Sequence, residues 1–154
     1  MVFQVLISTL HSEASRFFKN GVPTLIISQS GKNDRIKSGN SEFISFDERG
    51  LSKSRNRAIE NSQAEIALIA DDDVEFVPDF NKKILAAFAR YPEDDIITFQ
   101  VRTPEGIPYK NSYSDRSFQH GRSSIYRVSS VEIAIRPERI RSKGVRFDEK
   151  FGLG

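Results

Sequence analysis

The sequence predicts an α/β domain with a mostly parallel sheet that carries helices on both faces. Segments rich in apolar and β-branched residues alternate along the chain with segments of helical composition, an order typical of βαβ units. The expected strands are almost continuously apolar, as strands buried on both faces are. The chain has 154 residues, 38% hydrophobic and 29% charged. This fits one domain over residues 1–154 with a substantial core.

The first half of the chain holds four expected strands and two expected helices. VFQVLISTL and TLIIS are apolar and β-prone, and a Gly-Val-Pro break precedes the second. EFISF is a short third strand, and helix-forming residues separate it from the fourth, IALIA. The strands are expected at residues 2–10, 24–28, 42–46 and 66–70, and the helices at residues 11–19 and 51–62.

The second half is expected to contain one long helix, two strands and an extended connection. Pro78 stands where a helix can begin, and the apolar spacing in residues 79–90 suits packing on the sheet. Residues 96–101 and 130–135 are the expected strands. Between them, residues 102–127 mix Gly, Pro, Ser, Asn and charged residues, which is typical of a long irregular connection that carries function.

Composition limits the chemistry that the chain can support. It has no cysteine, which excludes disulfides, thiolate nucleophiles and cysteine-bound zinc, and its two histidines, His11 and His120, leave little scope for a histidine-built metal site. Carboxylates are therefore the expected ligands of any metal. A net charge of +2 argues against a nucleic acid partner. No apolar run approaches the length of about 20 residues that spans a membrane, so a cytoplasmic protein is expected.

Three consecutive aspartates, Asp71, Asp72 and Asp73, follow the fourth expected strand. In open parallel sheets, ligands bind beyond the carboxyl ends of the strands, which is where these residues lie. Adjacent carboxylates repel one another, and a hard divalent cation such as Mg²⁺ or Mn²⁺ would offset that repulsion. The alternative interpretation is a solvated turn that leads into the next helix. The position at the end of a buried strand favours the ligand site.

The helix before this strand places an arginine on its inward side. At 100° per residue, Arg55 falls inside the apolar stripe, whereas Arg57 points nearly opposite. Arg55 either pairs with a carboxylate, such as one of the aspartates, or lines a crevice and contacts a nucleotide. Asn56 lies at the margin of the stripe and is expected to bond backbone at the strand ends. The stripe itself is defined by Leu51, Ala58 and Ile59.

The segment GLSKSRNRAIENSQAEIALIADDDVEFVPDF resembles the central block of family 2 glycosyltransferases of the GT-A fold. That block consists of a Gly-Leu-Ser-x-x-Arg-Asn helix, a strand and an Asp-x-Asp metal motif. The first strand, ending in Ser8 and Thr9, resembles the nucleotide-binding start of the fold, and GVRFDEKFGLG resembles the segment before the acceptor-side carboxylates. One departure leaves the base preference open: Ser28, Gln29 and Ser30 stand where the family usually has a base-reading aspartate.

The resemblance implies a nucleotide diphosphate sugar donor, bound with Mn²⁺ or Mg²⁺ and used to glycosylate a saccharide or a lipid-linked acceptor. It implies the metal ligand Asp73, with Asp71 on the ribose or a metal-bound water, Asp72 on the sugar, and Ser8, Thr9 and Arg55 lining the base and ribose pocket. No residue matches the catalytic base of the family, which is expected beyond Gly154. We expect a C-terminally truncated domain with little transfer activity that is prone to self-association. It is expected to be cytoplasmic, with a peripheral location at the inner face of the membrane as the alternative.

Several alternatives stay open at the level of sequence. A nucleotidyltransferase on a related fold, or a nucleotide-sugar-binding module without turnover, would share the same strand-end carboxylates. A complete chain would need a base inside the long connection, and Asp115 is the candidate. Tyr109, Tyr113 and Phe118 in that connection either form a platform for a sugar ring or anchor the loop to the domain.

Overall fold

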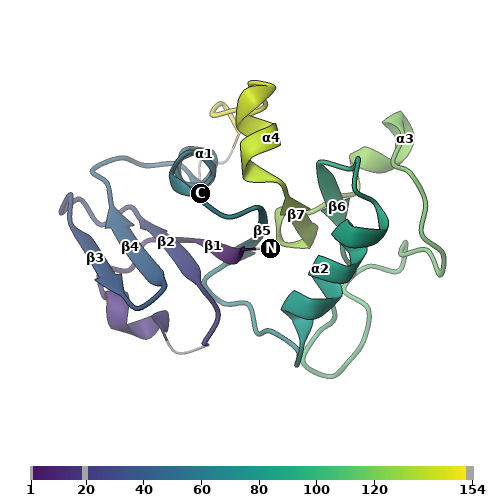
Figure 1. The fold of residues 1–154 in the computed structure, drawn as a ribbon, viewed down its shortest axis with the longest axis horizontal. Coiled ribbons are helices and arrows are strands. Elements are labelled where there is room, and N and C mark those ends of the chain that lie inside the picture. The colour runs from purple at the N-terminus through teal and green to yellow at the C-terminus, as the bar shows by residue number, and fades with distance from the viewer. Residues whose placement is uncertain (1, 19–20, 152–154) are drawn as a thin grey trace.

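The computed structural model describes residues 2–18 and 21–151, which fold around one mixed sheet (Figure 1). Its strand order is β3-β4-β2-β1-β5-β7-β6. The strands are β1 (Phe3–Thr9), β2 (Thr24–Ser28), β3 (Arg35–Ser38), β4 (Ser41–Ser45), β5 (Ile66–Asp71), β6 (Ile96–Thr98) and β7 (Ile133–Ile135).

The centre of the sheet is parallel, and its two sides are not. β1 pairs in parallel with both β2 and β5, and β2 pairs in parallel with β4. β3 forms an antiparallel hairpin with β4, and β7 runs antiparallel to both of its neighbours, β5 and β6. β6 therefore points the same way as β5, so that its carboxyl end lies at the same edge of the sheet. The predicted fold class, mostly parallel with helices on both faces, is confirmed.

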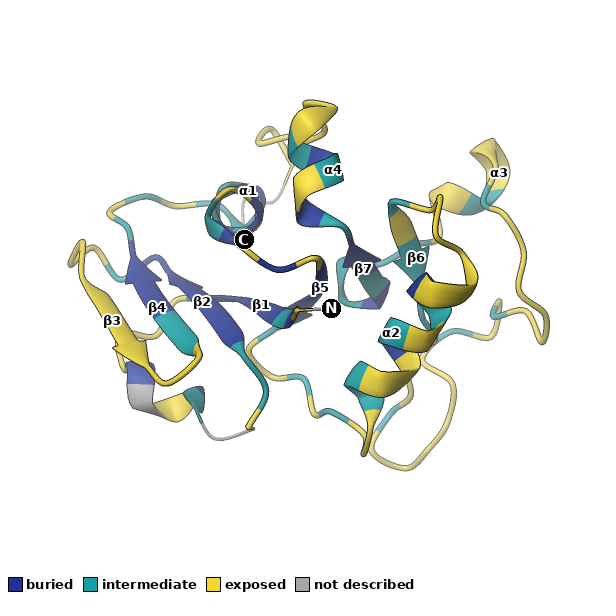
Figure 2. Ribbon diagram, viewed as in Figure 1, coloured by how far each residue is buried: buried dark blue, intermediate teal, exposed yellow. Residues whose placement is uncertain are grey.

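Helices cover the sheet on both sides (Figure 1). α1 (Leu51–Asn61) and α4 (Pro137–Ser142) lie on one face, and α2 (Phe80–Arg90) lies on the other. Alternate residues of each central strand point to opposite faces, so the core divides into two layers. Leu6, Ile27 and Ile69 pack with α1 and α4, whereas Val5, Ile7 and Ile26 pack with α2. Figure 2 shows the central strands buried and the connection after β6 largely exposed.

The expected helix at residues 11–19 is wrong. Among the described residues of this segment, only a short 3-10 turn, η1 (Ala14–Arg16), forms, and residue 19 lies outside the described part. A 3-10 turn aligns positions i and i+3, and Ala14 and Phe17 are both buried against the sheet in this way. Packing of two side chains therefore decides the local structure, because the segment offers no longer apolar face.

Two further expectations near the C-terminus need correction. The strand expected at residues 96–101 stops at Thr98, because its partner β7 is itself only three residues long. The strand expected at residues 130–135 begins instead with a 3-10 turn, η3 (Ser130–Glu132), in which the Ser129 N–H donates to the Glu132 carboxylate at 2.8 Å. A short α-helix, α3 (Arg122–Ile125), lies within the long connection expected at residues 102–127.

Beyond α4, the chain turns back and runs antiparallel along α1. The turn uses Gly144, whose φ of +63° lies in the left-handed region that favours glycine at a helix end. From Arg141 to Phe151, the chain makes contacts that follow α1 from its last residues to its first. In order, Arg141 donates to the Ser62 carbonyl (2.8 Å), Arg146 to Glu60 (2.6 Å), the Phe147 N–H to Asn56 (2.9 Å) and Ser52 to the Phe151 carbonyl.

In the described ranges, no helix is both long and apolar enough to cross a membrane.

Candidate functional site

Asp71 lies on the α1 face at the carboxyl end of β5. It continues the alternation of Ile69, which packs toward α1, and it stands opposite Ser8 in the register of β1. Arg55, on α1, donates from Nη2 to Asp71 Oδ1 at 2.9 Å. The Arg55 side chain is only 11% exposed, compared with 35% for Asp71. The pairing that the helix stripe suggested is therefore present, and it places a guanidinium directly beside the ends of β1 and β5.

Asp72 points to the other side of the sheet, toward the end of β1. Its Oδ2 accepts a hydrogen bond from Thr9 Oγ1 at 2.6 Å, and the Thr9 hydroxyl accepts in turn from the His11 N–H at 3.1 Å. His11 Nε2 lies 3.8 Å from the same carboxylate oxygen. Thr9 is buried, so its hydroxyl holds the Asp72 carboxylate from the protein side. The Asp72 side chain remains partly exposed to solvent.

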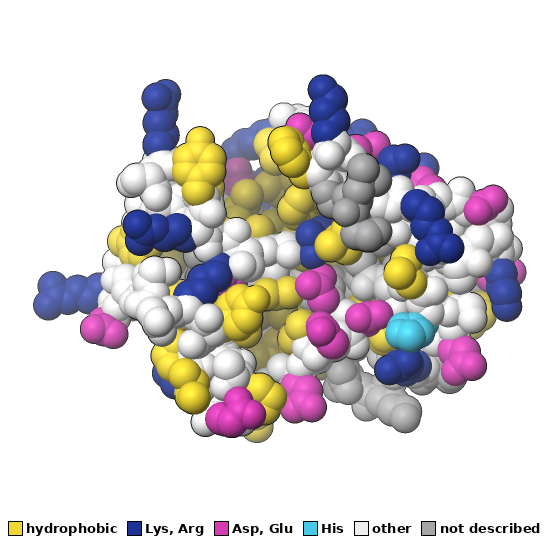
Figure 3. All heavy atoms as spheres, turned by 180° about the vertical axis from the view of Figure 1, so that it is seen from behind, with side chains coloured by type: hydrophobic (Ala, Val, Ile, Leu, Met, Phe, Trp, Pro, Cys, Tyr) yellow, Lys and Arg dark blue, Asp and Glu magenta, His cyan; other side chains and the backbone are white. Residues whose placement is uncertain are grey.

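Asp73 is exposed, and within the described part of the chain its carboxylate has no hydrogen-bond or ion-pair partner. The turn that carries it is nevertheless anchored. The Val74 N–H donates to the Asp71 carbonyl, and Phe76 stacks on Phe80 with ring centroids 4.5 Å apart. A carboxylate held on a fixed backbone without a protein partner is available to a ligand. Figure 3 shows acidic side chains gathered at the centre of one face of the molecule, with a histidine close by.

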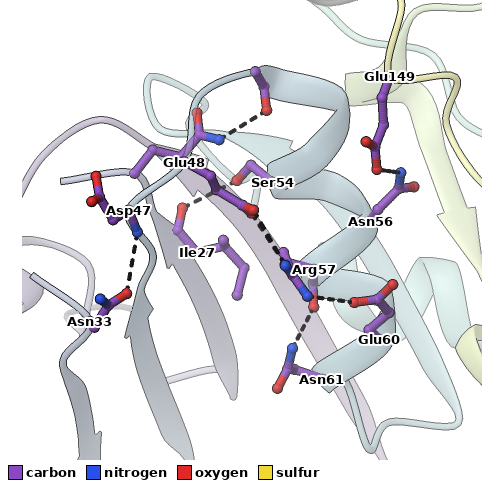
Figure 4. Close-up of polar contacts among 12 residues, drawn as sticks. Ile27, Asn33, Asp47, Glu48, Ser54, Asn56, Arg57, Glu60, Asn61 and Glu149 are labelled. Atoms are coloured by element: carbon purple, nitrogen blue, oxygen red, sulfur yellow. Dashed lines mark hydrogen bonds and ion pairs between the residues drawn. The ribbon is translucent and has the colours of Figure 1, made fainter. Parts of the chain in front are cut away.

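The two arginines of α1 lie on opposite sides of the helix, as the stripe predicts. Arg57 points away from Asp71, toward the segment that follows β4, and pairs with Glu48 at 3.2 Å and with Glu60 at 3.4 Å (Figure 4). Its side chain is 43% exposed. Hydrogen bonding to Glu48 raises the pKa of Arg57 above its ordinary value despite partial burial. These are the contacts of a surface ion pair, and none of them reaches the aspartates.

Asn56 differs from what the sequence suggests, and Gln29 has a structural contact of its own. Asn56 is buried, but it bonds the C-terminal segment and not the strand ends: its amide donates to the Phe147 carbonyl at 3.0 Å and to Glu149 at 3.2 Å, the second contact being drawn in Figure 4. Gln29, one of the three residues that stand where the family usually has a base-reading aspartate, is buried and donates its amide to the Gly50 carbonyl at 3.0 Å. Gln29 thereby ties the end of β2 to the start of α1.

A small polar cavity adjoins Asp72, and sequence reasoning missed it. It is lined by His11, Ser12, Glu13 and Arg16 and has a volume of about 230 Å³. Arg16 Nη1 approaches His11 Nε2 at 3.4 Å, and the backbone carbonyl of His11 accepts from the Ser28 hydroxyl at 2.7 Å. The signal was the position of His11, two residues beyond the end of a central strand, where the carboxyl edge begins.

The long connection after β6 is anchored by a buried carboxylate, Glu132. The carboxylate is 3% exposed and accepts hydrogen bonds from the Tyr113 hydroxyl, from Lys110 Nζ at 2.9 Å and from the Ser129 N–H. Burial alone would raise the pKa of Glu132, but these three donors outweigh burial and hold the pKa below its ordinary value. Tyr113 therefore anchors the loop, whereas Tyr109 and Phe118 remain more than half exposed.

The donor set at the carboxyl edge suits a hard cation only with help from a ligand. Within the described residues, no group of three or more histidine, aspartate or glutamate side chains is arranged to hold a metal by itself. Asp71 is engaged by Arg55 and Asp72 by Thr9, which leaves Asp73 as the free oxygen donor. Mg²⁺ and Mn²⁺ are commonly bound through one or two carboxylates together with substrate phosphates, so the residues fit such an ion in the presence of a phosphate-bearing ligand.

The family model described as Glycosyl transferase family 2 matches residues 19–145, which is most of the chain. The chain belongs to glycosyl transferase family 2. No curated protein matches the chain closely enough to count as a relative.

Solved structures of TarS from S. aureus share the fold of this glycosyl transferase family 2 chain. S. aureus TarS 1-349 superposes with a TM-score of 0.71 at 18% identity, over 99% of this chain and 52% of that one. Its complex with UDP gives 0.68 at 16% identity, over 99% and 52% of the two chains. Its complex with UDP-GlcNAc gives 0.65 at 17%, over 97% and 49%. The GT-A fold is thereby confirmed, and the chain spans about half the length of TarS 1-349.

Proposed function

We propose that this chain is the donor-binding part of a metal-dependent glycosyltransferase that uses a uridine diphosphate sugar to glycosylate an acceptor hydroxyl in polysaccharide or glycoconjugate synthesis. The observation that carries the proposal is the meeting of Arg55, Asp71, Thr9 and Asp72 at the carboxyl edge, with the Asp73 carboxylate left free beside them. Family membership supports sugar transfer. The complexes of TarS with UDP and UDP-GlcNAc support the choice of nucleotide.

Each residue of the site has a role consistent with its surroundings. Asp73, free and exposed, would hold a divalent cation together with the diphosphate, and the cation supplies charge neutralisation as the diphosphate departs. Asp71, oriented by Arg55, would contact the ribose or a water of the cation shell. Asp72, fixed by Thr9, faces the polar cavity near His11 and would contact the sugar. Ser8 and Thr9 would form the floor of the nucleotide pocket.

The test is calorimetric titration of the chain with UDP in the presence and absence of Mn²⁺. The two ligands should stabilise the protein together more than either does alone; a ligand at a hundredfold excess over its dissociation constant stabilises the folded state by about 2.7 kcal/mol. Asp73→Asn removes the charge from the only aspartate of the three without a protein partner in the described chain. We expect this variant to lose the Mn²⁺ dependence of UDP binding and to weaken binding at least tenfold.

Asp115→Asn is the matched control, because Asp115 is also an exposed aspartate but lies in the connection after β6. It should bind UDP and Mn²⁺ as the wild type does. Unchanged metal-dependent binding in Asp73→Asn would contradict the assignment of Asp73. Two parallel assays identify the reaction class. Release of sugar from a UDP-sugar indicates a transferase, release of pyrophosphate from UTP and a sugar 1-phosphate indicates a nucleotidyltransferase, and release of neither indicates a binding module.

A further inference from the structure

Arg55 is held between the aspartate site and the C-terminal segment. One side of its guanidinium donates to Asp71 at 2.9 Å. On another side, the guanidinium carbon lies 5.7 Å from the ring centroid of Phe147. This distance falls within the range in which an aromatic face attracts a cation. Phe147 belongs to the segment that runs back along α1, so one side chain connects the end of β5 with a residue far later in the chain.

The position of the guanidinium depends strongly on that ring. In the part of the chain that the structure describes, Asp71 is the only hydrogen-bond partner of the Arg55 side chain, and Arg55 Nε is buried with no partner. A buried donor without a partner disfavours the arrangement, so other contacts must keep Arg55 in place. A single hydrogen bond allows the guanidinium to rotate about it. The contact with the Phe147 ring opposes that rotation.

Phe147 is itself held by α1. Asn56 Oδ1 accepts from the Phe147 N–H at 2.9 Å, and Asn56 Nδ2 donates to the Phe147 carbonyl at 3.0 Å. This pair of bonds fixes the backbone on both sides of one Cα atom. Ser52, one helical turn earlier, donates to the Phe151 carbonyl. Arg55 and Asn56 are adjacent on α1, so the residue that bonds Asp71 and the residue that places the ring move as one unit.

We propose that Phe147, placed by Asn56, is a positioning residue for the Arg55–Asp71 pair, so that the docked C-terminal segment sets how tightly the aspartate site binds its nucleotide. The inference rests on the proposed function, because it assigns a ligand to that site. It extends the site to two residues that contact neither Asp72 nor Asp73. By linkage, nucleotide binding should also strengthen the docking of the segment on α1.

The same helix supplies a matched comparison. Arg57 also lies under a phenyl ring, that of Phe46, with its guanidinium carbon 5.0 Å from the ring centroid. Phe46 and Phe147 are both partly buried and pack against the same layer of the core. Arg57, however, pairs with Glu48 and Glu60 and not with an aspartate of the site. Removing either ring should therefore remove a similar amount of core packing, but only the Phe147 ring contacts the arginine that pairs with Asp71.

The experiment compares Phe147→Leu with Phe46→Leu, using UDP with Mn²⁺ as the probe. Loss of a cation–aromatic contact of this kind corresponds to about a three- to thirtyfold change in an equilibrium constant. We expect Phe147→Leu to raise the dissociation constant of UDP within that range, Phe46→Leu to leave it within about twofold of the wild type, and Phe147→Tyr to restore it. The melting temperatures of the two leucine variants should fall by similar amounts.

A second pair of variants tests the route through Asn56. Asn56→Ala frees the backbone of Phe147 and should weaken UDP binding as Phe147→Leu does. Arg146→Met removes a contact between the same segment and the same helix, the ion pair with Glu60, and should leave the affinity unchanged. Equal affinities for Phe147→Leu and the wild type, or equal losses in both leucine variants, would overturn the proposal.

A double-mutant cycle separates failure of this inference from failure of the proposed function. The cycle combines Phe147→Leu with Asp71→Asn and follows the unfolding equilibrium constant without nucleotide. Phe147 and Asp71 do not touch, yet both act on Arg55. The unfolding equilibrium constant of the double variant should therefore be at least about threefold smaller than the value expected if the two single effects multiplied. If the wild type fails to bind UDP, a coupled cycle still upholds the positioning role, and an independent cycle overturns it.

Discussion

The molecule carries two kinds of carboxylate site, and they differ in how completely the protein satisfies them. Glu132 is buried and is surrounded by a hydroxyl, an ammonium group and a backbone N–H, which together occupy its oxygens. Asp72 and Asp73 sit on the rim of the sheet, where one is held by a single hydroxyl and the other by nothing in the described chain. A saturated carboxylate holds structure together, whereas an unsaturated one on a rigid edge is free to take a ligand.

The largest expected effect tests this comparison through stability. Glu132→Ala leaves Lys110, Tyr113 and the Ser129 N–H without their common acceptor, and removing one partner of a buried charge pair costs about 3 kcal/mol or more. Asp73→Ala should change the free energy of unfolding by less than about 0.5 kcal/mol. Urea denaturation of both variants gives the two values, and similar losses would show that the division between structural and ligand-binding carboxylates is mistaken.

An intermediate effect is expected from loss of the Tyr113 hydroxyl, which donates to Glu132. Burial, followed by the bond to Glu132, raises the pKa of Tyr113 from 10.0 to about 12. The raised pKa means that the folded state favours the protonated phenol, so this contribution is complete below pH 10 and disappears as the pH rises through about 12. Tyr113→Phe should lose about 1.5 kcal/mol at neutral pH.

The pH dependence sharpens that measurement. The stability difference between the wild type and Tyr113→Phe should shrink between pH 10 and about 12, the interval over which the folded protein resists loss of the proton. Unfolding curves recorded for both proteins across this interval measure the difference directly. A constant gap from neutral to alkaline pH would show that the phenol does not depend on Glu132 in the way described.

A smaller effect is expected from Thr9, the residue that supports Asp72. Thr9→Val removes the hydroxyl that donates to Asp72 and that accepts from the His11 N–H. Because Asp72 is partly solvated, water replaces much of the lost bond, and the free energy of unfolding should fall by about 1 kcal/mol. Thermal unfolding of this variant provides the value. A loss as large as that of Glu132→Ala would place Asp72 among the structural carboxylates.

The central strands were predictable because burial on both faces leaves a continuous apolar pattern. Three of their four expected positions match within a residue at each end, and the fourth is shifted by one residue. β3 escaped prediction because all four of its residues are exposed and its pairing with β4 leaves no apolar alternation. The helix expected after β1 does not form although its residues have helical composition. Only Ala14 and Phe17 are buried among its described side chains, which is too little apolar surface to stabilise a full helix.

The site was predictable where it depends on local geometry. The inward position of Arg55 follows from helical periodicity, and its contact with Asp71 spans only 16 residues. Asn56 was assigned the wrong partner because Phe147 lies 91 residues later, and no pattern within α1 specifies that segment. His11 and the anchoring role of Glu132 were missed because each depends on where a loop crosses the sheet, which is a property of the tertiary fold.

The antiparallel run of the C-terminal segment along α1 makes the length of a connection as important as the identity of any side chain. Arg141 fixes one end of the run and Ser52 the other. The number of residues between α4 and Phe147 therefore determines which side chain lies beside Arg55. Deleting one of them would move Asp148 into the place of the ring beside Arg55. Inserting one would bring Arg146 there and set two positive charges against each other. A change of length in this segment is therefore expected to disturb Arg55 as much as a change at Phe147 does.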